Sequence, residues 1–396
     1  MASQGSYIIA GARTPIGKMS GALASFSAAD LGGFAIAAAL ERAGVAPEEV
    51  DHVIMGQVLM AGQGQVPSRQ AAVKAGIPMS VPSVNVNKVC LSGLNSIYLA
   101  NQMVASGEAD IVVAGGMESM TNAPYLADGA RGGFRYGNTE LRDAIIADGL
   151  WCSFDACLMG LGTDGYARDA EVTRAQQDEL AATSNERAAN AIKDGRLTDE
   201  IVAVSVPQRK GDPILVETDE GVRPGTTVES LGGLRPAFDS QGTVTAGNAS
   251  QLSDGGSAVI VMSKAEAERR GVEPLGEFVS YGMVAGPDNA SLLNQPSRAI
   301  LQAAERAGIA IGDIDLFEIN EAFAAVGIAS MAELGISDDI VNVNGGAIAL
   351  GHPIGMSGNR LALTMLHELK RRGGGTGAAA LCGGGGQGDA AILRTV

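Results

Sequence analysis

The chain has few cysteines and few positive charges, and each shortage excludes a class of protein. Four cysteines in 396 residues are too few for a disulfide framework. Lys and Arg number 28 against 44 Asp and Glu, and the resulting formal charge of −16 argues against a nucleic-acid or anionic-membrane surface. A local basic patch for a small anionic ligand is still compatible with that total.

The chain also lacks long apolar runs. None approaches the roughly 20 residues that cross a bilayer, and the first residues show neither the basic nor the apolar part of a signal peptide. We therefore expect a cytoplasmic protein with free thiols. Cys152 and Cys157 have no histidine nearby, so their spacing fits no zinc pattern, and no metal is expected. The length exceeds one ordinary domain and 46% of the residues are hydrophobic, which predicts two or three packed domains.

Three short sequences recur in the same order in the two halves of the chain. ERAG, ending at Gly44, recurs ending at Gly308, and VNVN at 84–87 recurs at 341–344. The pair Ser-Gly that opens a helical run at 92–93 recurs at 357–358. Because the order and spacing agree, the repeats indicate a duplication. Each half alternates helical and strand patterns, which is typical of βαβ units, and both copies of VNVN are predicted strands. The stretch from about 119 to 249 breaks the repeat and is predicted to be an insertion with two helical runs.

Cys90 follows the first VNVN and precedes a helix predicted to begin between Leu91 and Gly93. Free backbone N–H groups at a helix start favour a thiolate there. The alternative is a buried structural cysteine. His352 favours the reactive interpretation, because glycines and Pro353 place it in a turn that the repeat sets opposite the Cys90 turn.

The glycine-rich segment LCGGGGQGD begins at Leu381. It lacks the Gly-Lys-Ser/Thr of a phosphate loop and the crossover helix that follows a dinucleotide fingerprint. We predict a hairpin-like turn between buried strands, with Cys382 at its base. The bare N–H groups at its tip could form an oxyanion hole.

Six segments spread over the whole chain resemble the thiolase family. They are VNKVCLSG, VVAGGMESMTNAPY, GTVTAGNAS, NEAFA, GGAIALGHPIGMSG and LCGGGGQG. The subgroup closest in appearance has acetyl-CoA acetyltransferase activity. The resemblance implies an α/β, thiolase-like fold in which two duplicated βαβαβαββ core domains form a five-layered α-β-α-β-α arrangement with an inserted loop domain. The implied domains are residues 1–118 with 250–270, residues 119–249, and residues 271–396, and the implied assembly is a homodimer or homotetramer.

The resemblance also implies roles for residues that match the family's motifs. Cys90 would be the nucleophile that takes the acyl group, and His352 would accept its proton. Cys382 would be the second acid/base, which removes an α-proton from the second substrate. Asn320 would hold a water that donates, with His352, to the enolate oxygen. The backbone N–H groups of Cys90 and Gly384 would stabilise the tetrahedral intermediates.

The implied substrates are acetyl-CoA, acetoacetyl-CoA and CoA, with no further cofactor. The resemblance places Arg223 near the adenine nucleotide and Ser250 beside the pantetheine. Two segments depart from the family. Leu158 stands where members specific for acetoacetyl-CoA have histidine, and residues 285–298 lack their usual Met-Gly-Thr-Gly-Pro. Both segments are expected to border the acyl pocket, so a broader-range 3-ketoacyl-CoA thiolase of fatty-acid β-oxidation is the alternative.

Three other classes are compatible with parts of the pattern. A decarboxylating ketoacyl synthase has a similar double fold, but its cysteine works with two histidines or with histidine and asparagine. A Cys-His hydrolase needs no carbon-acid base. Neither explains Cys382. A non-catalytic scaffold that binds CoA would form no acyl-enzyme.

Overall fold

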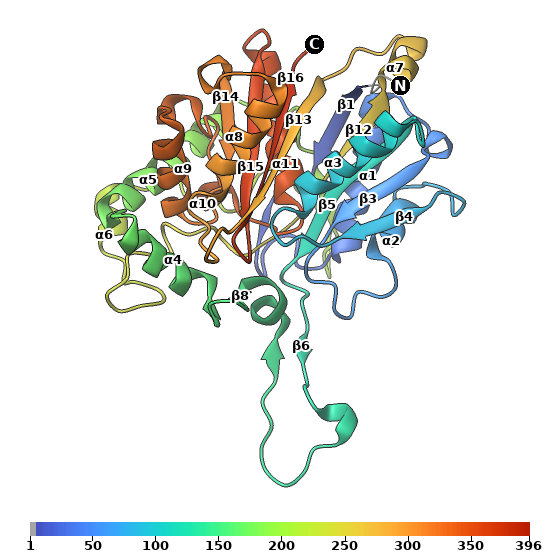
Figure 1. Ribbon diagram of the computed structural model, residues 1–396. Helices are drawn as coiled ribbons and strands as arrows, with labels where there is room; N and C mark the ends of the chain where they lie inside the picture. Colours follow the sequence, from blue (N-terminus) through green and yellow to red (C-terminus); the bar gives the residue numbers. More distant parts are fainter. Residues whose placement is uncertain (1–4) are drawn as a thin grey trace.

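The computed structural model describes residues 5–396, in which one large mixed sheet serves both halves of the chain (Figure 1). Its strand order is β14-β15-β16-β13-β1-β12-β5-β3-β4, and the halves meet where β1 pairs with β13. No helix within residues 5–396 is long and apolar enough to cross a membrane. The strands of the first half are β1 (Ser6–Arg13), β3 (His52–Gly56), β4 (Ser83–Val86), β5 (Ile111–Ser119) and β12 (Ser253–Ser263), with the short β2 (Gly17–Lys18) beside β12; those of the second are β13 (Gly276–Ala285), β14 (Leu316–Ile319), β15 (Thr376–Gly383) and β16 (Gln387–Arg394).

The two halves have nearly the same order of elements, as the sequence repeats predicted. The first half runs β1-α1-β3-α2-β4-α3-β5-β12, and the second runs β13-α8-β14-α9-α11-β15-β16 with the short α10 before α11. Parallel pairs lie at corresponding places, β3 with β5 and β14 with β15. The helices are α1 (Ala28–Ala43), α2 (Pro67–Lys74), α3 (Ser92–Ser106), α7 (Lys264–Arg270), α8 (Gln295–Ala307), α9 (Ala324–Leu334), α10 (Ala347–Leu350) and α11 (Ser357–Arg371).

The second copy of VNVN was wrongly predicted to be a strand. It forms only an isolated parallel bridge between Val341 and Phe317. Asn342 has a φ of 46°, a left-handed conformation that ends the extended chain. Its side-chain amide accepts from the N–H of Ile319 and donates to the carbonyl of the same residue, at 2.9 and 2.8 Å. The amide therefore replaces the backbone bonds that a strand would have made.

Alternate residues of the central strands point to opposite faces of the sheet and pack against different helices. The helices and strands therefore form five layers. On β12, Val259 and Val261 pack with α3 and α11, whereas Ile260 packs with α1 and α2. On β15, Leu381 faces the same central helices and Ala380 faces α8. Helices α3 and α11 pack against each other between the strands of the first half and the strands of the second half. The predicted five-layered, thiolase-like α-β-α-β-α arrangement is confirmed.

The segment between β5 and β12 adds no strand to the large sheet, as predicted for an insertion. One part is an arm, paired at β6 and β7, that extends away from the rest of the molecule (Figure 1). Another part packs α5 against α9 and α10 of the second half. The boundaries of the three predicted domains stay a prediction. The elements of this segment are β6 (Tyr125–Leu126), β7 (Arg142–Asp143), β8 (Trp151–Cys152), β9 (Cys157–Leu158), α4 (Met159–Asp169), α5 (Arg174–Lys193), β10 (Val204–Val206), β11 (Ile214–Val216) and α6 (Val228–Gly232).

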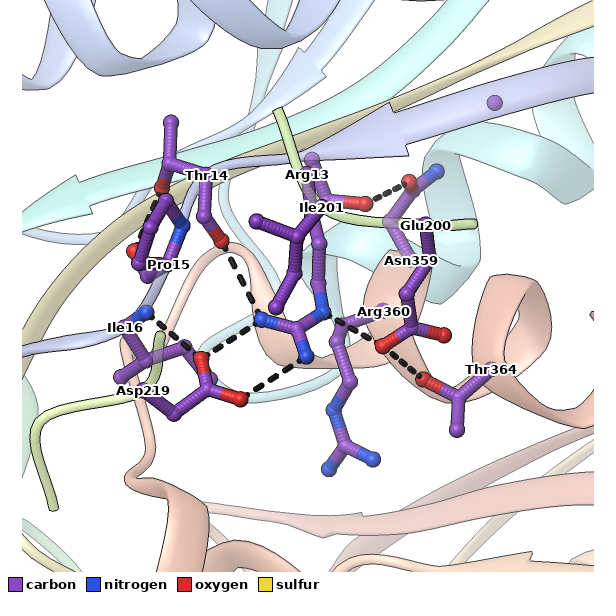
Figure 2. A network of polar contacts seen from close by, with 12 residues as sticks. Arg13, Thr14, Pro15, Ile16, Glu200, Ile201, Asp219, Asn359, Arg360 and Thr364 are labelled. Atoms are coloured by element: carbon purple, nitrogen blue, oxygen red, sulfur yellow. Dashed lines mark hydrogen bonds and ion pairs between the residues drawn. The ribbon is translucent and has the colours of Figure 1, made fainter. Parts of the chain in front are cut away.

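A buried ion cluster fastens the inserted segment to both halves (Figure 2). Arg13, at the end of β1, is fully buried, and its Nε donates to Glu200 at 2.6 Å. Its two terminal nitrogens donate to the two carboxylate oxygens of Asp219 at 2.7 and 2.9 Å. Thr364 of α11 also donates to Glu200, at 3.1 Å. The fork of the guanidinium thus holds two chain segments that are distant in sequence.

Replacing Arg13 by methionine would leave Glu200 and Asp219 buried without their cation. Breaking a buried pair in this way typically costs about 3–5 kcal/mol. We expect Arg13→Met to lower the free energy of unfolding by that amount in urea denaturation. Arg142→Met is the control, because Arg142 pairs with Asp128 on the surface, where a pair contributes about 0–1 kcal/mol. Equal losses in the two variants would contradict the role of the cluster.

Candidate active site

Four of the predicted site residues lie at or near the carboxyl ends of strands. Cys90 follows β4, Asn320 comes directly after β14, and Gly384 comes directly after β15, which contains Cys382. Carboxyl ends of parallel strands form one edge of a sheet, where α/β proteins usually bind ligands. Cys90 is near enough to Cys382 to raise the pKa of Cys382. Asn320 contacts His352. The structure therefore brings residues of both halves into one site.

Cys90 sits in a strained turn directly ahead of α3. Val89 has a φ of 52°, a conformation that β-branched residues rarely adopt. The turn is closed by the N–H of Ser92, which donates to the carbonyl of Val89 at 3.1 Å. Lys88 forms an ion pair at 2.7 Å with Asp389 of β16, so the turn is also tied to the second half. Backbone strain of this kind concentrates at functional sites.

Both cysteines of the site are neutral thiols in the free protein. Burial raises the pKa of Cys90 to about 12, although the backbone N–H groups of Cys90 and Gly384 face its sulfur and lower the pKa. We expected the helix start to favour a thiolate, and this expectation was wrong for the free protein, because burial outweighs the N–H groups. Burial, and then the neighbouring Cys90, also raise the pKa of Cys382.

His352 is a neutral imidazole with a defined tautomer. Burial, and then the positive charge of Arg360, lower its pKa to about 3. The hydroxyl of Ser357 donates its one proton to the carbonyl of Pro353 at 2.9 Å, so it accepts from Nδ1–H of His352 at 2.6 Å. The other ring nitrogen, Nε2, therefore carries no proton and faces Nδ2 of Asn320 at 3.4 Å. It is available as a base.

Asn320 provides unused hydrogen-bonding capacity beside His352. The residue is fully buried, and its backbone N–H donates to the carbonyl of Ala380 at 2.9 Å. Its side-chain Oδ1 has no hydrogen-bond partner within residues 5–396. Buried amide oxygens normally accept a hydrogen bond from protein or water. The unpaired oxygen is compatible with the predicted water site, and the role of Asn320 stays a prediction.

The turn that carries His352 fits against glycines of the first half, which we call the glycine seat: Gly56, Gly93 and Gly116. A Cβ built on any of the three would come within 2.8 Å of the carbonyl oxygen of Gly355. Such a contact is closer than real Cβ atoms allow, so larger residues would push the turn away. Because Gly93 belongs to α3, the glycine seat sets how closely the His352 turn approaches the helix that follows Cys90.

A largely apolar cavity of about 420 Å³ lies beside His352, within the size range of small-molecule pockets. Ser250 lines it, as a pantetheine contact would require. Leu158 also lines it, and its place beside an acyl group stays a prediction. Residues 285–298 do not line this cavity. Ala290 packs against Gly386 in the turn between β15 and β16, and Leu292 and Leu293 pack in one cluster with Cys382, so their place beside an acyl group stays a prediction. Further apolar lining residues are Met120, Ile145, Leu150, Phe238, Phe323 and Ile354.

Arg223 lies on the surface rather than in this cavity. Its backbone N–H donates to Oδ1 of Asn185 at 3.1 Å, and its side chain forms no ion pair with any residue in the range 5–396. Two residues earlier, the carbonyl of Gly221 accepts from Gln251, which lines the cavity. The guanidinium is therefore free and close in the chain to the cavity wall, and its role toward a phosphate stays a prediction.

The supporting role of Ser357 was not predicted from the sequence. Ser357 was noted only as the repeat counterpart of Ser92. Both serines begin a central helix and donate to a carbonyl of the preceding turn, Val89 for Ser92 and Pro353 for Ser357. The shared Ser-Gly helix start was therefore the signal for this role.

Comparison with known proteins now identifies the family. The model of the thiolase N-terminal domain matches residues 6–265, and that of the thiolase C-terminal domain matches residues 272–395. A "Probable acetyl-CoA acetyltransferase" of Mycolicibacterium smegmatis is 56% identical over 98% of this chain and 100% of its own. The acetyl-CoA acetyltransferases of Cupriavidus necator and Pseudomonas aeruginosa are 51% and 49% identical, over 98% of each chain. The chain belongs to the thiolase family and is an acyltransferase.

The tautomer of His352 generates a prediction. Ser357→Ala removes the acceptor of Nδ1–H, so the proton should redistribute toward Nε2 and acyl transfer to Cys90 should slow by about tenfold or more, since general-base help is typically worth 10²–10⁴-fold. Long-range ¹H–¹⁵N NMR of labelled histidine, of which the chain has three, reports the tautomer. Ser330→Ala is the control, because Ser330 is buried and bonds to Leu293. An unchanged His352 tautomer in Ser357→Ala would contradict the assignment.

Proposed function

We propose that the protein is an acetyl-CoA C-acetyltransferase, which cleaves acetoacetyl-CoA with CoA and runs the reverse condensation of two acetyl-CoA molecules. One observation carries the proposal: the buried Cys382 and the partly buried Cys90 lie together at the sheet edge, near the neutral His352, which borders an apolar cavity. The names of the relatives support the substrate. The mechanism is ping-pong, through an S-acetyl intermediate on Cys90.

In the first half of cleavage, Cys90 attacks the ketone carbonyl of acetoacetyl-CoA while Nε2 of His352 takes its proton. The N–H groups of Cys90 and Gly384, which face the sulfur, stabilise the oxyanion of the tetrahedral intermediate. The carbon–carbon bond then breaks, and the enolate of acetyl-CoA leaves. The protonated His352 and a water on Asn320 donate to the enolate oxygen. Cys382 gives its proton to the enolate carbon, which releases acetyl-CoA.

In the second half, the Cys382 thiolate takes the thiol proton of CoA. The CoA sulfur attacks the acetyl group on Cys90, and acetyl-CoA forms. The sulfur of Cys90 leaves and recovers its proton from His352, so all three groups return to their starting states. Condensation is the same sequence reversed, with Cys382 as the base that removes the α-proton.

Substitution of Cys382 separates the proposed roles of the two cysteines. Cys382→Ser should still acquire one acetyl group on Cys90 from acetyl-CoA, because His352 activates Cys90 and the CoA sulfur can leave as a thiolate without the proton of Cys382. Thiolysis and condensation should fall by about 10²–10⁴-fold, the usual contribution of a general acid/base. Intact-mass analysis and a thiolysis assay measure the two effects, and Cys157→Ser is the control thiol. Near-normal turnover of Cys382→Ser would contradict its role.

A broader-range 3-ketoacyl-CoA thiolase of fatty-acid β-oxidation is the second candidate. Leu158 favours it, because an aliphatic side chain makes the wall of the cavity apolar. Each further methylene of a substrate buried there would gain about 0.8 kcal/mol. Apolar pockets discriminate one methylene by only about 1–3 kcal/mol. We therefore propose that acetoacetyl-CoA is cleaved and that chains a few carbons longer are tolerated.

Chain length gives the matching prediction. Six- and eight-carbon ketoacyl-CoAs should have kcat/KM values within roughly tenfold to a few hundredfold of the four-carbon value. Leu158→His should reduce the values for the longer chains more than the value for acetoacetyl-CoA, because an imidazole makes the wall polar. Steady-state thiolysis assays with the three substrates measure these kcat/KM values. If the wild-type protein cleaves nothing longer than four carbons, Leu158 does not broaden the pocket.

We also propose that CoA extends from Ser250 toward Arg223 and that the protein assembles as a homodimer or homotetramer. The arm supports the assembly, because its aromatic residues Tyr125, Phe134 and Tyr136 are exposed to solvent in the single chain. Aromatic side chains presented in this way are typical of protein interfaces.

A further inference from the structure

Glu118 lies between the two halves of the chain, and the proposed mechanism does not use it. It belongs to β5 and is fully buried. Its Oε2 accepts from the N–H groups of Val58 and Gly355, both at 3.0 Å, and its Oε1 accepts from the N–H of Leu59 at 3.1 Å. Two of these donors belong to the first half, whereas Gly355 belongs to the turn that carries His352. One carboxylate therefore bonds to both halves.

The first-half donors lie beside the chain that leads to Cys90. The N–H of Gln57 donates to the carbonyl of Val86 at 3.0 Å. The side chain of Asn87 donates to the carbonyl of Val58 at 3.4 Å. The segment that precedes the nucleophile is thus joined through the Val58 turn and Glu118 to the turn of the catalytic base.

Burying Glu118 is unfavourable, so its bonds must compensate. Burial raises its pKa to about 7, while the three N–H groups lower it. No cation pairs with it among residues 5–396, in contrast to the buried Glu318, which pairs with Arg360. An apolar side chain would fill the same space but would leave three buried N–H groups without an acceptor.

We propose that Glu118 is a positioning residue that sets the distance between Cys90 and His352. Gly355 is fixed on both sides by the first half, at its N–H by Glu118 and at its carbonyl by the glycine seat. Glu118 does not line the cavity, so it does not touch a substrate there. Its charge also raises the pKa of Cys90, but Glu118→Gln and Glu118→Ala both remove that charge, so a difference between the two variants reports the positioning of the turn. This inference rests on the proposed function, because it assigns Glu118 a part in proton transfer from Cys90 to His352.

Two substitutions test the role. Glu118→Gln keeps the length and one oxygen, which can still accept from Val58 and Gly355, but it turns an NH₂ group toward the N–H of Leu59. Glu118→Ala removes all three bonds. A misplacement of about 1 Å can cost about 100-fold in rate. We expect kcat for thiolysis of acetoacetyl-CoA to fall by about tenfold in Glu118→Gln and by about 100-fold in Glu118→Ala, with KM within about threefold of the wild-type value.

Asp51 provides a matched control on the same pair of strands. It precedes β3 and accepts from the N–H groups of Asp110 and Ile111 at 2.9 Å, at the opposite end of β3 and β5 from Glu118. Asp51→Asn should lower the melting temperature and leave kcat unchanged. In every variant kcat is divided by the number of competent sites, counted as acetyl groups on Cys90. A residue that only stabilises the fold would reduce that number and the melting temperature, but not kcat per site.

The outcomes separate this inference from the proposed function. A wild-type protein that shows no thiolysis and no acetylated Cys90 would contradict the proposed function. With an active wild-type protein, wild-type kcat per site in Glu118→Gln and Glu118→Ala would overturn the role of Glu118. An equal fall in Asp51→Asn would overturn it too, because the effect would then be general to the sheet. If Glu118→Ala does not fold, the kcat and KM of Glu118→Gln decide alone.

Discussion

The contact between Gly355 and the glycine seat is the constraint on which the site depends. Cys90, the proposed nucleophile, and His352, its proposed base, come from different halves of a duplicated chain. Three glycines of the first half let the carbonyl of Gly355 approach more closely than any Cβ would permit. The resulting close fit places the His352 turn against α3, the helix that begins just after Cys90. Small residues at these points are therefore needed for the close approach of the two halves at the proposed site.

Burial determines the protonation states that the chemistry starts from. The thiols of Cys90 and Cys382 are neutral because burial disfavours the thiolate, and His352 is neutral because burial disfavours the imidazolium. In the physiological range none of the three carries a charge in the free protein. In the proposed mechanism, proton transfer from Cys90 therefore accompanies attack on the substrate, when N–H groups can stabilise the developing oxyanion.

Much of this architecture could be predicted from sequence, because it depends on local pattern. The repeats predicted the two halves, and the glycine-rich segment predicted the hairpin at Cys382. Predictions failed where the local conformation or the ionisation state depends on one side chain or on a contact between distant parts of the chain. The amide of Asn342 replaced a predicted strand, and burial reversed the expected ionisation of Cys90. Glu118 bonds to Gly355, 237 residues away in the chain, and no local pattern reveals such a contact.

The most direct test of the account is to find which atom carries the acyl group. Brief exposure to acetyl-CoA, followed by intact-mass analysis and peptide mapping, should show one acetyl group per chain, on Cys90. Cys90→Ser should show none. Acetylation that persists in Cys90→Ser, or that maps to another residue of the wild-type protein, would contradict the central claim that Cys90 is the nucleophile.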